Sequence, residues 1–341
     1  MRALLIVNPA ATATTASRRD LLTHALAGEL SLRVAHTRAR GHAADLAAAA
    51  ADAGTDLIVV HAGDGTVNEV VNGMLARGVD APRPQLAIVP GGSTNVFARA
   101  IGVDPDPTLA TEQILLALAS GSTRTVSLGR VGERYFTFNS GMGIDAEVVR
   151  AVEEERGTGR SISNAMHLRA TVRQVVRSDR RRPRLSVRWR PNAAGPVDPD
   201  ASSGAAVEGG SDGMLETLAG GPPGTPTESA EPAFLVFVSN VSPWTYYGNR
   251  EIVTNASTRP EAGLGLFAVT RMSMPVVLGI ARRMIRPVGS SNHRALLHHD
   301  DVAAVRVTAD RPVAVQADGD YLGEWTDVLF THVPQAVTVV V

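Results

Sequence analysis

The fold of this chain is decided by residues 57–71, which read LIVVHAGDGTVNEVV. The first four residues are apolar and mostly β-branched, which predicts a buried strand. The last residues place Val67, Val70 and Val71 at helical spacing. Two glycines around an aspartate lie between these halves. A strand that turns into a helix through glycines presents backbone N–H groups at the helix N-terminus, and phosphate binds well there.

An acidic side chain, Asp64, stands inside this candidate phosphate site. A carboxylate tolerates a phosphate neighbour when a cation lies between them, and Mg²⁺, which prefers oxygen ligands, is the usual one. The segment therefore indicates a nucleoside triphosphate with Mg²⁺. The spacing matches neither GxxxxGK[ST] nor GxGxxG, so a Walker nucleotidase and an ordinary dinucleotide binder are both excluded.

Predicted strands and helices alternate over the first 123 residues. Apolar runs predict strands at 3–7, 32–35, 57–60 and 85–89. Helical spacing predicts helices at 17–30, 41–53, 67–76 and 108–119. This alternation predicts a parallel sheet that binds ligands at the carboxyl ends of its strands. Three strand ends, at residues 8–9, 63–66 and 91–95, would then line one crevice.

The pattern changes near residue 120, where short β-like runs replace the alternation. Helical sequence interrupts them at about 144–155 and 163–177. Among the later runs, 302–307 and 313–316 predict two separate strands. A β-rich second domain, sandwich or barrel-like, fits these runs best. The stretch 191–232 holds Pro, Gly, Ser, Ala and acidic residues, and it predicts a disordered insert.

Composition sets further bounds on function. The chain has 341 residues, enough for two domains, and a net charge of −1, which does not favour a nucleic-acid partner. It has no cysteine, which excludes thiol catalysis. All 33 basic residues are arginine, so cationic contacts to phosphate must come from arginine, a metal or backbone N–H groups. No apolar run reaches the ~20 residues of a membrane span, and a cytoplasmic protein is expected.

Five short motifs occur in a defined order along the chain. They are NP at 8–9, AGDGTVNE at 62–69, PGGSTNVFAR at 90–99, GMGIDA at 141–146 and DGD at 318–320. In order and spacing this set resembles the diacylglycerol kinase catalytic domain family, the bacterial soluble lipid kinases related to sphingosine and ceramide kinases. The resemblance extends over essentially the whole chain apart from 191–232.

The resemblance implies an α+β fold in two parts. An α/β nucleotide domain at 1–123, like those of 6-phosphofructokinase and NAD kinase, would be followed by a β-sandwich lipid-binding domain at 124–341. The last strands would pack back near the first domain, and ATP and lipid would meet in the cleft between the domains.

The resemblance also implies roles for individual residues. The candidate catalytic acids are Asp64, Asp318 and Asp320. Asp64 would lie beside the nucleotide phosphates and Mg²⁺, and Asp320 would occupy the general-base position next to Asp318. The residues implied for ATP are Asn8, Thr37, Ala62, Gly63, Asp64, Gly65, Thr66, Val67, Asn68, Gly92, Ser93, Thr94 and Asn95.

The chain departs from the family pattern at three positions. Ala62 replaces a glycine, which is compatible with ATP binding if its φ is negative. Asp320 replaces a glutamate and is one methylene shorter, which would set the base back by about 1.5 Å. Ala262 stands where an acid that helps bind a structural Mg²⁺ is expected, and Glu261 is the candidate substitute ligand.

Two segments have more than one interpretation. Asp318-Gly319 is a favoured hairpin dipeptide, so the motif that ends in Asp320 can be a turn, a catalytic element or both. Residues 272–288 form a basic amphipathic stretch. It predicts either a helix that packs on the β-rich domain with solvated arginines, or a contact with anionic lipid.

The motifs predict an ATP- and Mg²⁺-dependent kinase that phosphorylates a lipid hydroxyl, with diacylglycerol giving phosphatidic acid as the leading reaction. The alternatives are another acceptor, such as a sphingoid base or a glycolipid, and a degenerate nucleotide-binding regulatory protein. Peripheral, transient membrane contact is expected, and a homodimer is left open.

Overall fold

The computed structural model describes residues 1–11, 16–143, 146–147, 149–150, 182–192, 230–248, 250–284 and 293–341. The predicted helices at 144–155 and 163–177, and residues 193–229 of the predicted insert 191–232, lie almost entirely outside this set. The chain forms two compact units. Unit 1 comprises Met1–Leu128, Thr245–Arg250 and Pro334–Val341, and unit 2 comprises Gly129–Trp244 and Glu251–Val333. The domain boundary expected at 123/124 stays a prediction.

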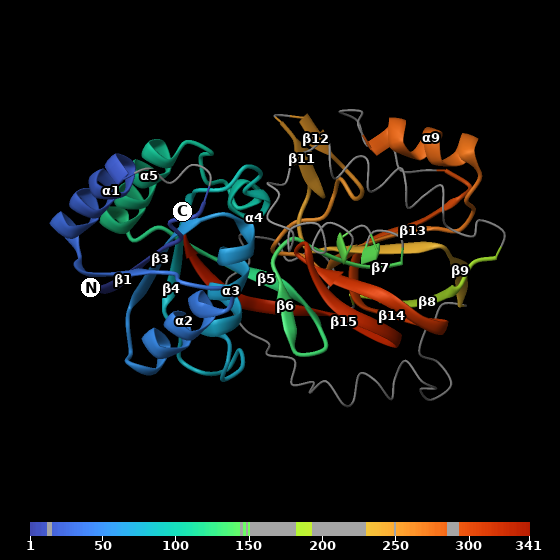
Figure 1. Ribbon diagram of the computed structural model, residues 1–341, viewed down its shortest axis with the longest axis horizontal. Helices are drawn as coiled ribbons and strands as arrows, with labels where there is room; N and C mark the ends of the chain where they lie inside the picture. Colours follow the sequence, from blue (N-terminus) through green and yellow to red (C-terminus); the bar gives the residue numbers. More distant parts are fainter. Residues whose placement is uncertain are drawn as a thin grey trace. The chain divides into compact units, whose positions relative to one another are not determined.

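A parallel sheet forms the centre of unit 1 (Figure 1). Its strands in spatial order are β2 (Ser31–His36), β1 (Arg2–Val7), β3 (Leu57–Ala62) and β4 (Gln85–Pro90). Strand β3 is buried along its whole length, whereas β2, at the sheet edge, is largely accessible. A parallel strand covered on both faces needs the continuous apolar sequence that 57–60 provides. The α/β architecture expected of this half is confirmed.

Helices cover both faces of this sheet (Figure 1). Helices α1 (Ala16–Glu29) and α5 (Pro107–Ser120) lie on one face, and α2 (His42–Asp52) and α3 (Asp64–Met74) lie on the other. A short helix, α4 (Val96–Ala100), follows β4. Apolar side chains from α1, α5 and the strands share one core cluster, which includes Leu26, Leu57 and Ile114.

The end of the chain completes the sheet of unit 1. Strand β15 (Asp320–Val340) reaches this unit at its C-terminal end, where Val339 pairs in parallel with Leu86 of β4. Strand β5 (Thr123–Val131) begins beside it, with the hydroxyls of Thr125 and Thr338 3.2 Å apart.

Antiparallel strands form the core of unit 2. Strand β10 (Leu235–Ser239) lies between β13 (Leu264–Val269) and β7 (Asn139–Gly143), and β7 pairs with β14 (Leu296–Ala317). Since β14 also pairs with β13, these four strands form a closed circuit. This closure is typical of a barrel-like arrangement, one of the two expected for the β-rich half. The core cluster of unit 2 also contains large side chains from other strands, such as Trp189, Phe136 and Phe330.

Shorter elements complete unit 2 and its margins. Strand β8 (Leu185–Pro191) pairs with β14 and with β9 (Glu231–Ala233), and β6 (Arg134–Phe136) pairs with β5. Strands β11 (Thr245–Tyr247) and β12 (Arg250–Ile252) form a separate two-stranded sheet. Helix α9 (Met274–Met284) follows β13. No helix of the described residues is long and apolar enough to cross a membrane.

One strand differs from the sequence-based expectation. The runs 302–307 and 313–316 are not separate strands but parts of the 22-residue β14. The pairing with β15 shifts register between Thr308 and Val313. Pro312 lies in this gap and has no N–H to donate to a ladder. The proline that suggested a break therefore produces an irregularity inside one long strand.

Candidate functional site

Three strand ends meet at the carboxyl edge of the unit 1 sheet. Asn8 follows β1, and its side-chain Nδ2 donates a hydrogen bond to Oγ1 of Thr66 at 3.0 Å. The backbone N–H of Asn8 donates to the carbonyl of His61 in β3 at 3.2 Å. Thr37, at the end of β2, donates its N–H to the carbonyl of Val7 at 2.9 Å. The structure thus brings Asn8, Thr37 and Thr66 to one edge of the sheet.

The glycines of the two loops after β3 and β4 allow the loop backbones to touch. A Cβ atom on Gly92 would lie 2.7 Å from the Cα of Gly63. A Cβ on Gly91 would lie 3.0 Å from the Cα of Ala62. Real Cβ atoms do not approach backbone as closely as 2.7 Å, so a side chain on Gly92 would separate the loops. The contacts at Gly91 and Gly63 are tight but less extreme, and packing therefore accounts most clearly for Gly92.

The Gly92→Ala variant is expected to lower the free energy of unfolding by about 1–3 kcal/mol, because the new methyl overpacks the contact with Gly63. Equilibrium denaturation by urea measures this loss. The matched control is Gly28→Ala, since a Cβ atom on Gly28 meets nothing within 4 Å and alanine favours the helix α1. An unfolding free energy that is unchanged in Gly92→Ala would contradict the packing explanation.

Gly65 differs from the other loop glycines. It is exposed, its φ is not in the left-handed region, and a Cβ atom added to it would meet no atom of the described residues within 4 Å. Neither packing nor backbone conformation of the described chain requires a glycine there. Gly65 lies in the first turn of α3, where the leading N–H groups of a helix have no intrahelical partner. The space in front of this turn is open to an anionic ligand.

The Asp64 side chain connects the two loops. Its Oδ2 accepts a hydrogen bond from the hydroxyl of Thr94 at 2.9 Å, and its Oδ1 accepts one from the N–H of Phe97 at 3.4 Å. Burial raises the pKa of the Asp64 carboxyl above its ordinary value, and hydrogen bonds from the loop and from α4 oppose this rise. The carboxylate therefore holds the second loop against the start of α3.

The surroundings of Asp64 limit how a metal could bind. Among the described residues, no group of three or more His, Cys, Asp or Glu side chains could hold a metal ion. A single carboxylate suits Mg²⁺ when phosphate oxygens and water supply the other ligands, as is usual for this ion. The residues present therefore fit a Mg²⁺ that arrives with a triphosphate. They do not form a metal site built by the protein alone.

Asn95 shapes the second loop, and Ser93 and Thr94 lie within it. Asn95 has a left-handed backbone with φ of 48°, a conformation that asparagine tolerates better than most residues. Its side chain accepts a hydrogen bond from the N–H of Gly92 and donates one to the carbonyl of Gly92, both at 2.9 Å. Ser93, between them, is exposed. The loop thus presents Ser93 outward while Asn95 braces it from inside.

Three predicted nucleotide residues are buried in the fold. Ala62 is the last residue of β3, and its φ is not in the left-handed region, so alanine replaces glycine there without backbone strain. Val67 and Asn68 lie in α3 with 3% and 0% of their surface exposed. The amide of Asn68 accepts a hydrogen bond from Asn72 at 3.1 Å. In this structure the side chains of Val67 and Asn68 support α3 from inside.

Sequence reasoning gave no role to Glu69. Its carboxylate accepts hydrogen bonds from the N–H groups of Gly41 and Ala43, at 2.8 and 3.3 Å. These groups lie at the start of α2, where Gly41 provides no side-chain cap. Glu69 therefore caps a helix that begins 28 residues earlier in the chain. The one sequence signal for this contact is that Gly41, which precedes α2, has no side chain to cap the helix.

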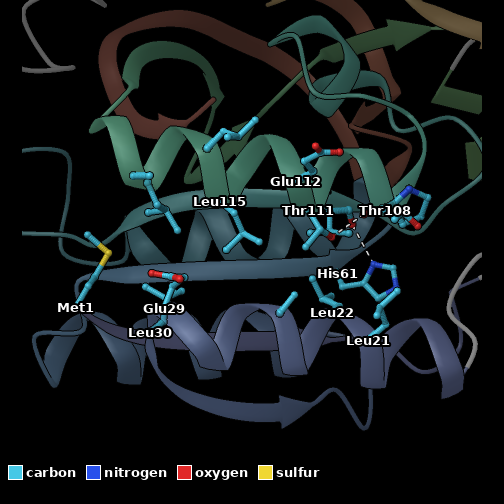
Figure 2. A pocket seen from close by; sticks show the side chains of 16 residues that line it. Met1, Leu21, Leu22, Glu29, Leu30, His61, Thr108, Thr111, Glu112 and Leu115 are labelled. Carbon is cyan, nitrogen blue, oxygen red and sulfur yellow. Dashed lines mark hydrogen bonds between the residues drawn. The ribbon is translucent and has the colours of Figure 1, made fainter.

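A cavity of about 610 Å³ lies between α1 and α5 (Figure 2). Apolar side chains line most of it, including Leu22, Leu30 and Leu115. His61 reaches its margin from β3, and Nδ1 of His61 is 3.2 Å from the carbonyl of Val89. The lining contains none of the loop residues 63–66 or 91–95. The cavity is therefore separate from the candidate phosphate site.

In unit 2, Asp318 and Gly319 form the turn between β14 and β15. Both have positive φ, of 48° and 81°, and Ala317 pairs directly with Asp320. Two central residues with positive φ are characteristic of a type I′ hairpin, for which Asp-Gly is favoured. The turn interpretation of the DGD motif is therefore what the backbone shows.

The Asp318 carboxylate is buried and held by four hydrogen bonds. Oδ2 accepts from the N–H and hydroxyl of Thr137 at 2.6 and 2.7 Å, and Oδ1 accepts from the N–H groups of Phe138 and Asn139, both at 3.0 Å. Burial raises the pKa of Asp318 to about 6, although these hydrogen bonds act to lower it. Asp318 thus fixes the segment that leads into β7.

Asp320 forms an ion pair with Arg134. Nη2 of Arg134 lies 3.0 Å from Oδ2 of Asp320, and the side chains are 29% and 21% exposed. The Nε of Arg134 is buried with no hydrogen-bond partner in the described part of the chain. Asp320 is accessible enough to meet a ligand, while Asp318, 6% exposed, is not.

The predictions for two further segments stay predictions. Glu261 is half-buried and belongs to no group of three or more metal-ligand side chains within the described ranges. Beside it, the N–H of Gly263 donates to Asp301 at 2.8 Å. Of the motif at 141–146, Gly141 to Gly143 lie in β7, and residues 144 and 145 lie outside the described set.

The N-terminal part of the chain is similar to known proteins. Residues 2–131 match the family model described as the diacylglycerol kinase catalytic domain. A diacylglycerol kinase of Bacillus subtilis (strain 168) is 38% identical over 110 residues, which are 31% of this chain and 33% of that protein. One from Staphylococcus aureus (strain JH9) is 36% identical over 81 residues, 24% of each chain. The match thus spans a third or less of the length of these relatives.

The whole fold is similar to a crystal structure described as a diacylglycerol kinase from Bacillus anthracis str. Sterne. The TM-score is 0.66 at 18% identity, and the match covers 99% of this chain and 96% of that one. At this identity the likeness establishes the fold alone. The family match at 2–131 confirms the predicted resemblance for the part of the chain that holds the first three motifs, and the similarity to the crystal structure confirms the two-part α+β fold.

Proposed function

We propose that this chain is an ATP-dependent lipid kinase that transfers the γ-phosphate of ATP to a lipid hydroxyl, with diacylglycerol as the acceptor and phosphatidic acid as the product. One observation carries the proposal. Within the segment that matches the diacylglycerol kinase catalytic domain, two glycine loops clasp each other and leave Gly65 facing open space at the start of α3. The open start of a helix is a common binding place for phosphate, which supports a phosphate site here.

The residues divide the chemistry of phosphoryl transfer between them. The N–H groups at the start of α3, with Asn8 and Thr66, bind the phosphates, and the exposed hydroxyl of Ser93 donates to them. Asp64 would hold a Mg²⁺ as one of its ligands, and that ion would supply positive charge to the phosphates. Asp320 accepts the proton of the acceptor hydroxyl, and Arg134 and Asp318 are positioning residues for it.

The Gly65→Ala variant tests ATP binding without a large change in the stability of the fold. The variant is expected to keep the unfolding free energy of the wild type to within about 1 kcal/mol, because alanine favours the helix and no described atom is in its way. Its ATP affinity is expected to fall at least about tenfold, because the methyl occupies the space for phosphate. Calorimetric titration with Mg²⁺-ATP measures the affinity. An affinity equal to that of the wild type would show that this loop does not bind the phosphates of ATP.

The acceptor is identified by incubating the chain with labelled ATP, Mg²⁺ and a total lipid extract, and by separating the labelled lipids. A labelled phosphatidic acid supports the proposal. A labelled sphingoid base or glycolipid would show that this lipid is the acceptor instead of diacylglycerol. Asp64→Asn is expected to remove the labelling, because it takes away the Mg²⁺ ligand. ATP binding without transfer to any lipid would instead indicate a nucleotide-binding regulatory protein.

A further inference from the structure

Helix α9 of unit 2 carries two apolar stripes, and only one of them is covered. Val276, Ile280 and Met284 recur at helical spacing and pack against aromatic side chains of β10 and β13. On the other side, Met274 is 44% exposed and Leu278 is 64% exposed. A helix that only packs on a sheet needs a single apolar stripe. The second stripe is therefore unexplained by the fold.

The charged side chains of residues 271–284 are all basic. Arg271 and Arg282 are exposed before and within α9, and Arg283 follows directly. Residues 271–284 contain no acidic residue, and neither do the two strands beneath them, β10 and β13. An apolar strip flanked by arginines is the pattern by which a helix lies in the interface of an anionic bilayer.

The exposed Leu116 lacks this setting. Leu116 of α5 is also 64% exposed, yet α5 contains Glu112 and no basic residue. A second copy of the chain is a poor occupant for the α9 stripe, since the same arginines would face one another. The positive charge therefore favours an anionic lipid bilayer as the partner, because its interior is apolar and its headgroups are anionic.

We propose that the α9 surface, formed by Met274 and Leu278 with Arg271 and Arg282, docks unit 2 on anionic phospholipid membranes. The inference deepens the proposed lipid kinase function, because a diacylglycerol acceptor lies in a membrane. Leu278 and Met274 insert between the headgroups, and the two arginines pair with lipid phosphates. The packed stripe of Ile280 keeps the helix fixed to the sheet while the outer stripe is inserted.

Vesicle co-sedimentation without nucleotide tests the surface. The wild-type chain is expected to bind vesicles of phosphatidylcholine with phosphatidylglycerol, and to bind vesicles of phosphatidylcholine alone weakly. Leu278→Glu is expected to weaken binding at least about tenfold, and Arg271→Gln with Arg282→Gln about fivefold per arginine. The matched control Leu116→Glu, at equal exposure, is expected to bind like the wild type.

The same variants are compared as kinases. Activity on diacylglycerol dispersed in detergent is expected to be equal in Leu278→Glu and the wild type, while activity on anionic vesicles falls with binding. The α9 assignment is overturned if vesicle binding is unchanged in both the Leu278 and the arginine variants. It is also overturned if Leu116→Glu loses vesicle binding to the same extent. Neither result contradicts the kinase proposal. Binding that depends on α9, with no transfer to dispersed lipid, supports the surface and overturns the kinase proposal instead.

Discussion

Asp320→Asn is expected to lower kcat for lipid phosphorylation about 10²- to 10⁴-fold, the usual contribution of a general base. The amide keeps the size of the side chain but cannot accept the acceptor proton at neutral pH. Asp320 is part-exposed and held by Arg134 at 3.0 Å, so the change removes a charge and leaves the backbone of the hairpin in place. Steady-state kinetics with Mg²⁺-ATP and dispersed diacylglycerol measure the loss.

Asp320→Glu is the matched control for this prediction. It restores the longer acid that the family pattern has at this position, and it is expected to retain activity. The apparent KM for ATP is expected to be unchanged in both variants, because the phosphate site of unit 1 does not include Asp320. A kcat for Asp320→Asn within threefold of the wild type would show that another group takes the proton.

Asp318→Ala is expected to lower the free energy of unfolding by about 2–4 kcal/mol. Four buried donors, from Thr137, Phe138 and Asn139, lose their acceptor, and each unsatisfied buried donor costs about 1–3 kcal/mol. Water entering the vacated space satisfies some of them, so the expected loss lies at or below the lower end of the summed cost. Urea denaturation measures the change, and an unfolding free energy equal to that of the wild type would contradict the bracing role.

The pKa of Asp318 gives this carboxyl a defined pH dependence. Its pKa is raised from 3.8 to about 6 in the folded chain, so the folded state holds the proton more tightly than the unfolded state does. The contribution of Asp318 to stability therefore increases as the pH falls from about 6 to about 4. The full effect is about 3 kcal/mol. In Asp318→Asn this increase in stability is expected to disappear. Denaturation of the wild type and the variant at pH 7 and pH 4.5 measures it, and an equal increase in the two proteins would contradict the prediction.

Much of unit 1 could be predicted from residues 57–71 because the signals there are local. A β-branched run, a glycine turn and valines at helical spacing specify strand, loop and helix without information from distant residues. The site at the strand ends followed from the rule that parallel strands end at one edge of a sheet. Asn8 and Thr66, 58 residues apart, were expected at that edge, and they share a hydrogen bond there.

The functions of individual side chains were less predictable, because they depend on long-range contacts. Asn68 was expected to hold ATP, yet its side chain is fully buried inside unit 1. Glu69 belongs to the same motif and caps α2. Asp318 was grouped with Asp320 as a catalytic acid, yet hydrogen bonds to residues about 180 positions earlier hold its carboxylate. The motif therefore indicated which positions contribute to the fold or the candidate site, whereas the role of each side chain depends on its contacts in the folded chain.

Transfer of labelled phosphate from ATP to a defined lipid tests the central proposal most directly. The purified chain is incubated with γ-labelled ATP, Mg²⁺ and dispersed diacylglycerol, with sphingosine and a glycolipid in parallel reactions, and the lipid products are separated. The predicted result is labelled phosphatidic acid from the wild type and Asp320→Glu, and little or none from Asp64→Asn and Asp320→Asn. The contradicting result is the absence of label in all three lipids from a wild-type chain that binds ATP, or full labelling by Asp64→Asn.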